Sequence, residues 1–104
     1  MTFDDPDVDT LRDRLADPDP RVRRVALFDF LDLQAPALLP DVIERLREDP
    51  ERALRAEAAR ALTGWDRIEV VRALAAALRD VPPVCDAAAQ ALADLQQLTS
   101  ARHA

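Results

Sequence analysis

The sequence has 104 residues, which is enough for one domain with a modest core. Hydrophobic residues make up 49% and aromatic residues only 4%; with one glycine and no tyrosine, this composition excludes a β-sandwich, whose turns and strands need such residues. A net charge of −6 disfavours nucleic acid as a partner, and no apolar stretch approaches the roughly 20 residues of a membrane span. We expect an all-α protein with an interior of Leu, Val and Ala.

The chain begins with two helical patterns joined by a tight turn. Two Asp-Pro pairs fill this turn at residues 16–20 (ADPDP), between an apolar pattern that ends at Leu15 and a second that ends near Leu33. Asp19 is expected to cap the second helix, and Pro20 to take its first position, where the missing N–H is not needed. The prolines therefore mark a helical hairpin.

The hairpin recurs twice further along the chain. In the second copy, Asp49 is expected to cap the second helix and Pro50 to open it. Gly64 stands where a left-handed residue would end this copy. Asp66, with Glu69 three residues later, forms a capping-box pattern that predicts the start of the third copy.

Apolar residues at helical spacing align the three copies. The second helices give the columns Val22, Leu54 and Val84; Ala26, Ala58 and Ala88; and Phe30, Leu62 and Leu92. The first helices give the sets Val8, Leu11 and Leu15; Leu39, Val42 and Leu46; and Val71, Leu74 and Leu78. Three copies of about thirty residues predict a short right-handed α-solenoid of three helical hairpins and six helices.

The spacing also predicts the domain organisation. We expect one repeat domain over residues 1–98, because each hairpin buries its apolar face only against its neighbours. Residues 99–104 are polar and are expected to form a frayed tail. The repeats are expected at about 5–34, 35–65 and 66–98.

The repeat resembles the short HEAT repeats first noted in phycobilisome-lyase subunits. The shared pattern is Asp-Pro in the turn, then Val or Leu followed by Arg, then an Ala-rich helix that ends in Leu. It is carried by DPDPRVRRVALFDFL (residues 17–31) and DPERALRAEAARAL (residues 49–62). The resemblance covers about residues 7–97 and implies a HEAT-like fold.

The resemblance further implies a ladder of ion pairs between turn aspartates and second-helix arginines of adjacent repeats. On this sequence it maps onto Asp17 or Asp19 with Arg23, and onto Asp49 with Arg55. The third copy departs from the pattern, because position 85 is a cysteine where arginine is expected. We interpret the ladder as structural.

No pattern in the sequence indicates catalysis. His103 is the only histidine and Cys85 the only cysteine, so no nucleophile–base pair and no internal disulfide are expected. Cys85 is interpreted as a small apolar filler. The carboxylates near helix starts are explained by capping and the helix dipole. We expect no catalytic residue, no metal and no cofactor, and a cytoplasmic location.

Large or charged side chains outside the core columns predict a protein-binding surface. Phe28, Arg60 and Gln90 share one register position on the second helices, and Arg24 lies one turn before Phe28. Trp65 follows the glycine at the joint between the second and third copies. We expect Arg24, Phe28, Arg60 and Trp65 to bind another protein, because aromatic and arginine side chains dominate such interfaces.

Alternatives to this interpretation stay open. Phe28 and Trp65 could instead be core residues, packed between helices or under the joint. The resemblance permits an accessory subunit of a chromophore lyase in place of a general adaptor, scaffold or accessory subunit. Apolar faces at the two ends of the solenoid would also permit self-association.

Overall fold

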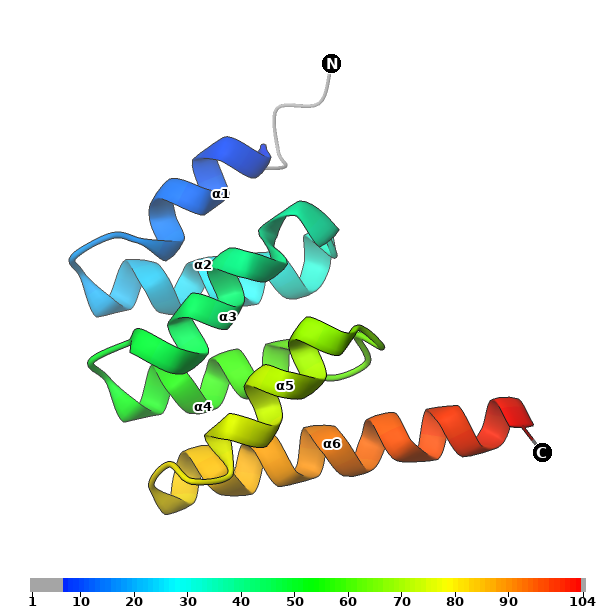
Figure 1. Ribbon diagram of the computed structural model, residues 1–104. Helices are drawn as coiled ribbons and strands as arrows, with labels where there is room; N and C mark the ends of the chain where they lie inside the picture. The colour runs from blue at the N-terminus through cyan, green and yellow to red at the C-terminus, as the bar shows by residue number, and fades with distance from the viewer. Residues whose placement is uncertain (1–6, 104) are drawn as a thin grey trace.

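The computed structural model of the chain describes residues 7–103, with side chains as far as Leu98. Over these residues it has six α-helices, one 3₁₀ turn and no strand. They are α1 (Val8–Leu15), α2 (Pro20–Leu33), η1 (Pro36–Leu38), α3 (Leu39–Glu48), α4 (Arg52–Ala61), α5 (Ile68–Ala77) and α6 (Pro82–His103). Consecutive helices pair as three stacked hairpins, which confirms the predicted all-α solenoid (Figure 1).

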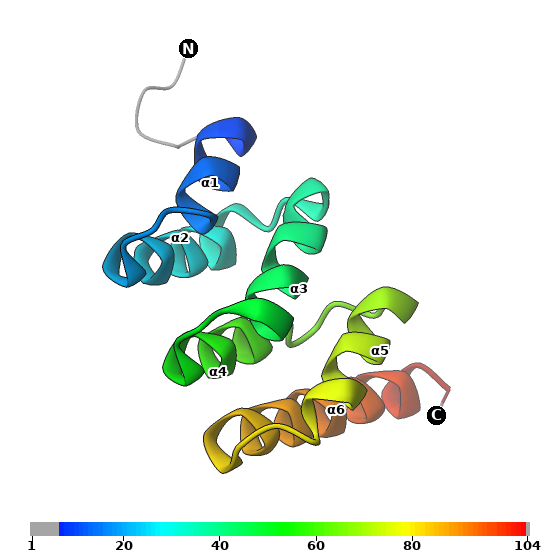
Figure 2. The same ribbon diagram turned by 60° about the vertical axis from the view of Figure 1, so that its left-hand side comes forward.

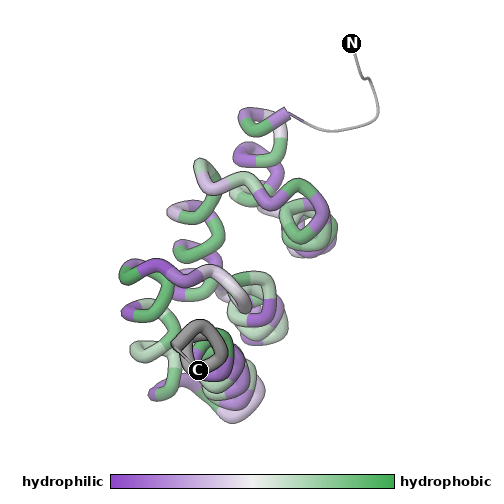
Figure 3. Tube along the Cα trace, turned by 90° about the vertical axis from the view of Figure 1, so that its right-hand side faces the viewer, coloured by the Kyte–Doolittle hydropathy of each residue, from purple (hydrophilic) through white to green (hydrophobic). Residues whose placement is uncertain are grey.

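The six helices form two layers. The first helices of the hairpins, α1, α3 and α5, lie in one layer, and the second helices, α2, α4 and α6, lie side by side in the other (Figures 1 and 2). The view along the second helices shows the layers edge on, with apolar segments turned toward each other (Figure 3). The described chain is a slab of 42 × 33 × 16 Å. A slab this thin has one core, between the layers.

Helix α2, the second helix of the first hairpin, begins and ends as the sequence predicts. Asp19 is the N-cap of α2 and accepts a hydrogen bond from the Arg21 backbone N–H at 2.9 Å. Pro20 is the first helical residue. The helix ends at Leu33, after which Gln34 adopts a left-handed φ of 52°. The second Asp-Pro pair of the turn thus starts the helix.

The start of α4 differs from the prediction. The helix begins at Arg52 with Glu51 as its N-cap, so Asp49 does not cap it and Pro50 does not open it. Asp49 instead accepts a hydrogen bond from the Glu51 N–H at 2.9 Å, and its carboxylate is buried against Arg23. The contact with the preceding hairpin holds this aspartate in the turn, ahead of the helix.

The joint before α5 confirms one expectation and corrects another. Gly64 has a φ of +91°, the left-handed conformation expected of it. The predicted capping box of Asp66 and Glu69 is wrong, because the N-cap of α5 is Arg67, which makes no side-chain capping bond. The Arg67 N–H donates to the Trp65 carbonyl at 2.9 Å. This tight turn delays the helix until Ile68.

The core agrees with the second-helix columns more closely than with the first-helix sets. Ala26, Ala58 and Ala88 are all fully buried. In α5, however, the predicted set is displaced by one residue at its ends: Val71 is only partly buried and Leu78 is 44% exposed. The buried residues of α5 are Val70, Ala73, Leu74 and Ala77. Alanines fill these core positions because small side chains let helices approach closely.

The C-terminal tail was expected to fray from residue 99, but α6 continues to His103. The physical reason is that the sequence after Pro83 contains neither glycine nor proline, the residues that end helices. The predicted limits at residues 1 and 5 and the last residue lie outside the described residues. None of the described helices is long and apolar enough to cross a membrane.

Candidate functional site

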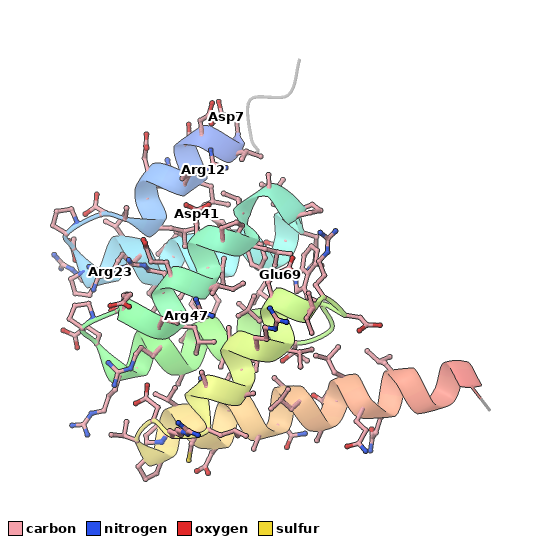
Figure 4. The ribbon with its side chains drawn as sticks, in the orientation of Figure 1. Asp7, Arg12, Arg23, Asp41, Arg47 and Glu69 are labelled. Carbon is pink, nitrogen blue, oxygen red and sulfur yellow. The ribbon has the colours of Figure 1, made fainter. Side chains whose placement is uncertain are left out.

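A buried arginine joins the first two hairpins. Arg23 on α2 donates from Nε to Asp49 Oδ2 at 2.8 Å and from Nη2 to Asp49 Oδ1 at 3.0 Å. Its Nη1 donates to the carbonyls of Asp17 and Pro18, in its own turn, at 2.8 and 3.0 Å. Figure 4 shows Arg23 at the edge where the second helices begin. The hydrogen bonds that Arg23 donates to the Asp49 carboxylate raise the pKa of the Arg23 guanidinium.

The same arrangement repeats between the second and third hairpins. Arg55 on α4 donates from Nε to Asp80 Oδ2 at 2.9 Å and from Nη2 to Asp80 Oδ1 at 3.0 Å. Its Nη1 donates to the Asp49 carbonyl at 2.8 Å. The hydrogen bond from Arg55 holds the pKa of the Asp80 carboxyl below its usual value. We call the pairs Arg23–Asp49 and Arg55–Asp80 the ladder.

The ladder is present between adjacent repeats, but its pairing differs from the residue-by-residue expectation. Each arginine pairs with the aspartate of the following hairpin, not with Asp17, Asp19 or Asp49 of its own turn. Each arginine reaches its own turn only through backbone carbonyls. For Arg55 the reason is that Asp49, the aspartate of its turn, faces Arg23 of the preceding hairpin.

A further ion pair in the first-helix layer was not predicted. Arg12 on α1 donates from Nε to Asp41 Oδ2 on α3 at 3.2 Å, and both residues are labelled in Figure 4. Arg12 also pairs with Asp9 at 3.1 Å. Arg12 lies 31 residues before Ile43, a buried residue of α3. A polar residue at an apolar register position was the signal available in the sequence.

Three exposed apolar side chains form a strip along α2, which we call the α2 strip. Its members are Val25, Phe28 and Leu31, which are 55%, 49% and 39% exposed. Their spacing of three residues places them on one side of the helix. Phe30 is fully buried, because a step of two residues turns the side chain to roughly the opposite side. Phe28 is therefore on the surface, and the alternative that it is a core residue is not supported.

Two predicted arginines lie on the same outer face of the second-helix layer, the face turned away from the first helices. Arg24 is exposed one turn before Phe28. Arg60 on α4 is exposed at the position equivalent to Phe28 and pairs with Glu57 at 3.0 Å. On α6 the equivalent residue is Gln90, which donates to Asp94 at 3.0 Å. The outer face thus changes from apolar on α2 to polar on α4 and α6.

Trp65 lies apart from the other three predicted residues. Its ring is half-buried and stacks on Phe30, with ring centroids 5.8 Å apart. Arg67 places its guanidinium 6.0 Å from the ring centroid. The indole Nε1 is buried without a hydrogen-bond partner among the described residues. Because Phe30 and Phe28 point to opposite sides of α2, Trp65 belongs to the core side.

The cysteine shows no sign of activation. Cys85 is partly buried, and its Sγ lies 3.5 Å from the Pro82 carbonyl and 3.8 Å from Asp86 Oδ1. Burial, and then the negative charge of Asp86, raise the pKa of the thiol. A protonated thiol is a poor nucleophile. Among the side chains that the structure describes, which end at Leu98, no three His, Cys, Asp or Glu residues gather as a metal site would need.

Stacked hairpins joined by repeated ion pairs define the class of helical-repeat proteins, the α-solenoids. The model of one family, HEAT repeats, matches residues 8–93, so the chain belongs to the HEAT repeat family. HEAT repeats generally mediate protein–protein interaction and are generally non-catalytic. No curated protein and no solved structure matches the chain.

Proposed function

We propose that this chain is a non-catalytic protein-interaction module, an adaptor, scaffold or accessory subunit, that binds another protein through the α2 strip and the arginines beside it. The single observation that carries this proposal is the exposure of Val25, Phe28 and Leu31 together on one helix. Single exposed apolar residues are normal on protein surfaces, whereas adjacent ones mark binding sites.

Comparison with the equivalent positions of the second hairpin supports the proposal. Residues 32 positions after Val25, Phe28 and Leu31 are Glu57, Arg60 and Thr63, all polar. The repeat therefore tolerates polar residues on this face, and the apolar residues of α2 are not needed for the stacking of helices. This difference favours a role in binding over a role in folding.

The charges beside the strip indicate the chemistry of the partner. Arg24 lies on α2 next to Phe28, and Arg60 occupies the neighbouring position on α4. An apolar helix or loop with carboxylates along its edge would bury Phe28 and pair with these arginines. We leave Trp65 out of this surface, because it stacks on the core.

The test compares partner capture by folded variants. The chain with Phe28→Ser and Arg60→Glu is immobilised beside the unaltered chain and exposed to a lysate of the source cells. We expect one protein to be captured by the unaltered chain and lost with the variant, while the melting temperature changes little. The matched control is Ile68→Ser, which removes an exposed apolar side chain at the start of α5. Equal capture by the variant, or equal loss with the control, would contradict the proposal.

The chromophore-lyase alternative is supported only by the resemblance of the repeats to the phycobilisome-lyase type. It predicts that the chain co-purifies with a second HEAT-like subunit and a pigment. Absorbance of the chain isolated from its source cells distinguishes the two functions, since an adaptor purifies without colour.

A further inference from the structure

The turn of the first hairpin holds an aspartate in the same conformation as a ladder aspartate. Asp17 Oδ1 accepts a hydrogen bond from the N–H two residues ahead, that of Asp19, at 2.8 Å. Asp49 Oδ1 accepts from the N–H two residues ahead, that of Glu51, at 2.9 Å. Because the two turns share this hydrogen bond, the Asp17 carboxylate has the same orientation in its turn as the Asp49 carboxylate, which faces Arg23, has in the next.

Asp17 nevertheless has no arginine partner among residues 7–98, whose side chains the structure describes. Asp49 pairs with Arg23 and Asp80 with Arg55, each from the hairpin before. No described hairpin precedes α1, and Arg23 contacts only the Asp17 backbone carbonyl. The first hairpin therefore presents the acceptor half of a ladder pair on the side turned away from the second hairpin.

The apolar part of a repeat contact is also present at this end. Val22 lies at the register of Leu54 and Val84, which are buried in the second and third hairpins, yet Val22 is only partly buried. Val25, one turn further, is more than half exposed. An open depression of about 420 Å³ lies here, lined by Arg14, Arg21, Val22 and Val25. Terminal repeats usually present a polar outer face instead.

The opposite end of the solenoid lacks the donor half. Cys85 on α6 stands at the register of Arg23 and Arg55. Ala89, at the register of the buried Leu27 and Ala59, is exposed there. A second copy of this chain, joined end to end, would bring a cysteine instead of an arginine to Asp17. The two ends are thus not complementary to each other.

We propose that the side of the first hairpin turned away from the second, formed by Asp17, Val22 and Val25, docks the arginine-bearing end of a helical-hairpin array on another protein. The incoming second helix supplies an arginine that pairs with Asp17 and small apolar side chains that cover Val22 and Val25. The contact continues the ladder by one step. It goes beyond the proposed function, because it shares only Val25 with the α2 strip and otherwise uses the end of the solenoid.

The experiment supplies the missing arginine on this chain itself. A donor chain carries Cys85→Arg, which completes its C-terminal end, and Asp17→Asn, which weakens its own acceptor. The acceptor is the unaltered chain. Sedimentation velocity and titration calorimetry follow the mixture and each chain alone, and thermal unfolding establishes that the donor is folded. We expect a 1:1 complex only in the mixture, since the acceptor carries no arginine at position 85.

Three acceptor variants locate the contact. Asp17→Asn keeps the turn hydrogen bond but removes the charge, and should weaken binding roughly tenfold to a hundredfold. Asp13→Asn, on the exposed side of α1, should leave affinity unchanged. Phe28→Ser should also leave it unchanged, which separates this contact from the outer-face surface.

Three results would overturn the proposal. They are the absence of a complex at concentrations of roughly 1 mM, a complex equally strong with Asp17→Asn, and equal binding by a donor that keeps Cys85. The last result would show that a second copy of the chain occupies this end without any arginine.

Discussion

Arg23 and Asp49, 26 residues apart, form a two-bond ion pair that is almost completely buried. Nε lies 2.8 Å from Oδ2 and Nη2 lies 3.0 Å from Oδ1, and the two side chains are 5% and 0% exposed. Arg45 also approaches Asp49 Oδ2, at 3.4 Å. Because Nη1 also donates to two backbone carbonyls, four of the five guanidinium N–H groups are hydrogen-bonded, and the pair fixes the second hairpin on the first.

Replacement of Asp49 by alanine should destabilise the protein by about 3 kcal/mol, because Arg23 would remain buried without its counter-charge. Urea unfolding followed by circular dichroism measures this loss. Arg21→Ala is the matched control, since Arg21 pairs with Asp19 at the surface and should matter little. Equal losses in the two variants would show that burial of the ladder pair is not what stabilises the contact.

Acid should weaken the second ladder pair. The pKa of Asp80 is below its ordinary value of 3.8 in the folded protein, chiefly because of the hydrogen bond from Arg55. The stability from this group is present above the unfolded pKa, and it is lost as the pH falls through the folded pKa. The free energy of unfolding should therefore fall less between about pH 6 and about pH 2.5 in Asp80→Asn than in the unaltered chain. The same fall in both would contradict this assignment.

Truncation of the two phenylalanines of α2 should have very different effects on the free energy of unfolding. Phe30→Ala removes a fully buried ring that also supports Trp65, and should cost about 3–5 kcal/mol. Phe28→Ala should change the free energy of unfolding by about 0.5 kcal/mol or less. Thermal and urea unfolding of both variants measure the difference. A large loss for Phe28→Ala would make it part of the core and remove it from the binding surface.

The alanines of α4 set how closely its neighbours approach. Ala59 is fully buried, so Ala59→Leu should force the helices apart and cost about 1–3 kcal/mol. Ala53→Leu, on the exposed side of the same helix, should be neutral because leucine and alanine are both good helix formers. Chemical unfolding of the pair tests this; a neutral Ala59→Leu would mean that the helices are not closely packed.

Gly64 should resist substitution for conformational reasons alone. Its φ of +91° is unfavourable for other residues, and an added Cβ would meet nothing within 4 Å. Gly64→Ala should therefore cost about 1 kcal/mol through the backbone, and Gly64→Asn less, because asparagine adopts left-handed conformations more readily. Thermal unfolding ranks the three proteins. An alanine variant as stable as the original would mean that this joint relaxes.

The sequence predicts the hairpin repeat because a helix period and a proline turn are both local signals. The columns of α2, α4 and α6 contain Ala26, Ala58 and Ala88, which are all buried. The sequence does not predict which face of α5 is buried, because VVRALAAAL is apolar around most of the helix and no single face stands out. Leu78 then looks more suitable for the core than Ala77, although Ala77 is the buried one.

The candidate site depends on neighbours that local patterns do not contain. The partner of Arg23 is decided by the position of the second hairpin, so a mapping within one turn selects the wrong aspartate. The exposure of Phe28 and the burial of Trp65 depend on which sides of α2 other helices cover. The arginines and aromatic residues chosen from the sequence are typical of binding surfaces. Only the fold shows that Trp65 packs on the core while the other three lie on the surface.

The middle hairpin is the only one of the three that both receives and gives a ladder contact, through Asp49 and Arg55. A tandem copy of this hairpin would bring both an aspartate for the hairpin before it and an arginine for the hairpin after it. It could be inserted without leaving any ladder residue unpaired. Duplication of the last hairpin would instead place a thiol where the chain needs a cation. Growth of such a protein in evolution, or in the laboratory, is thus most readily achieved by copying its centre.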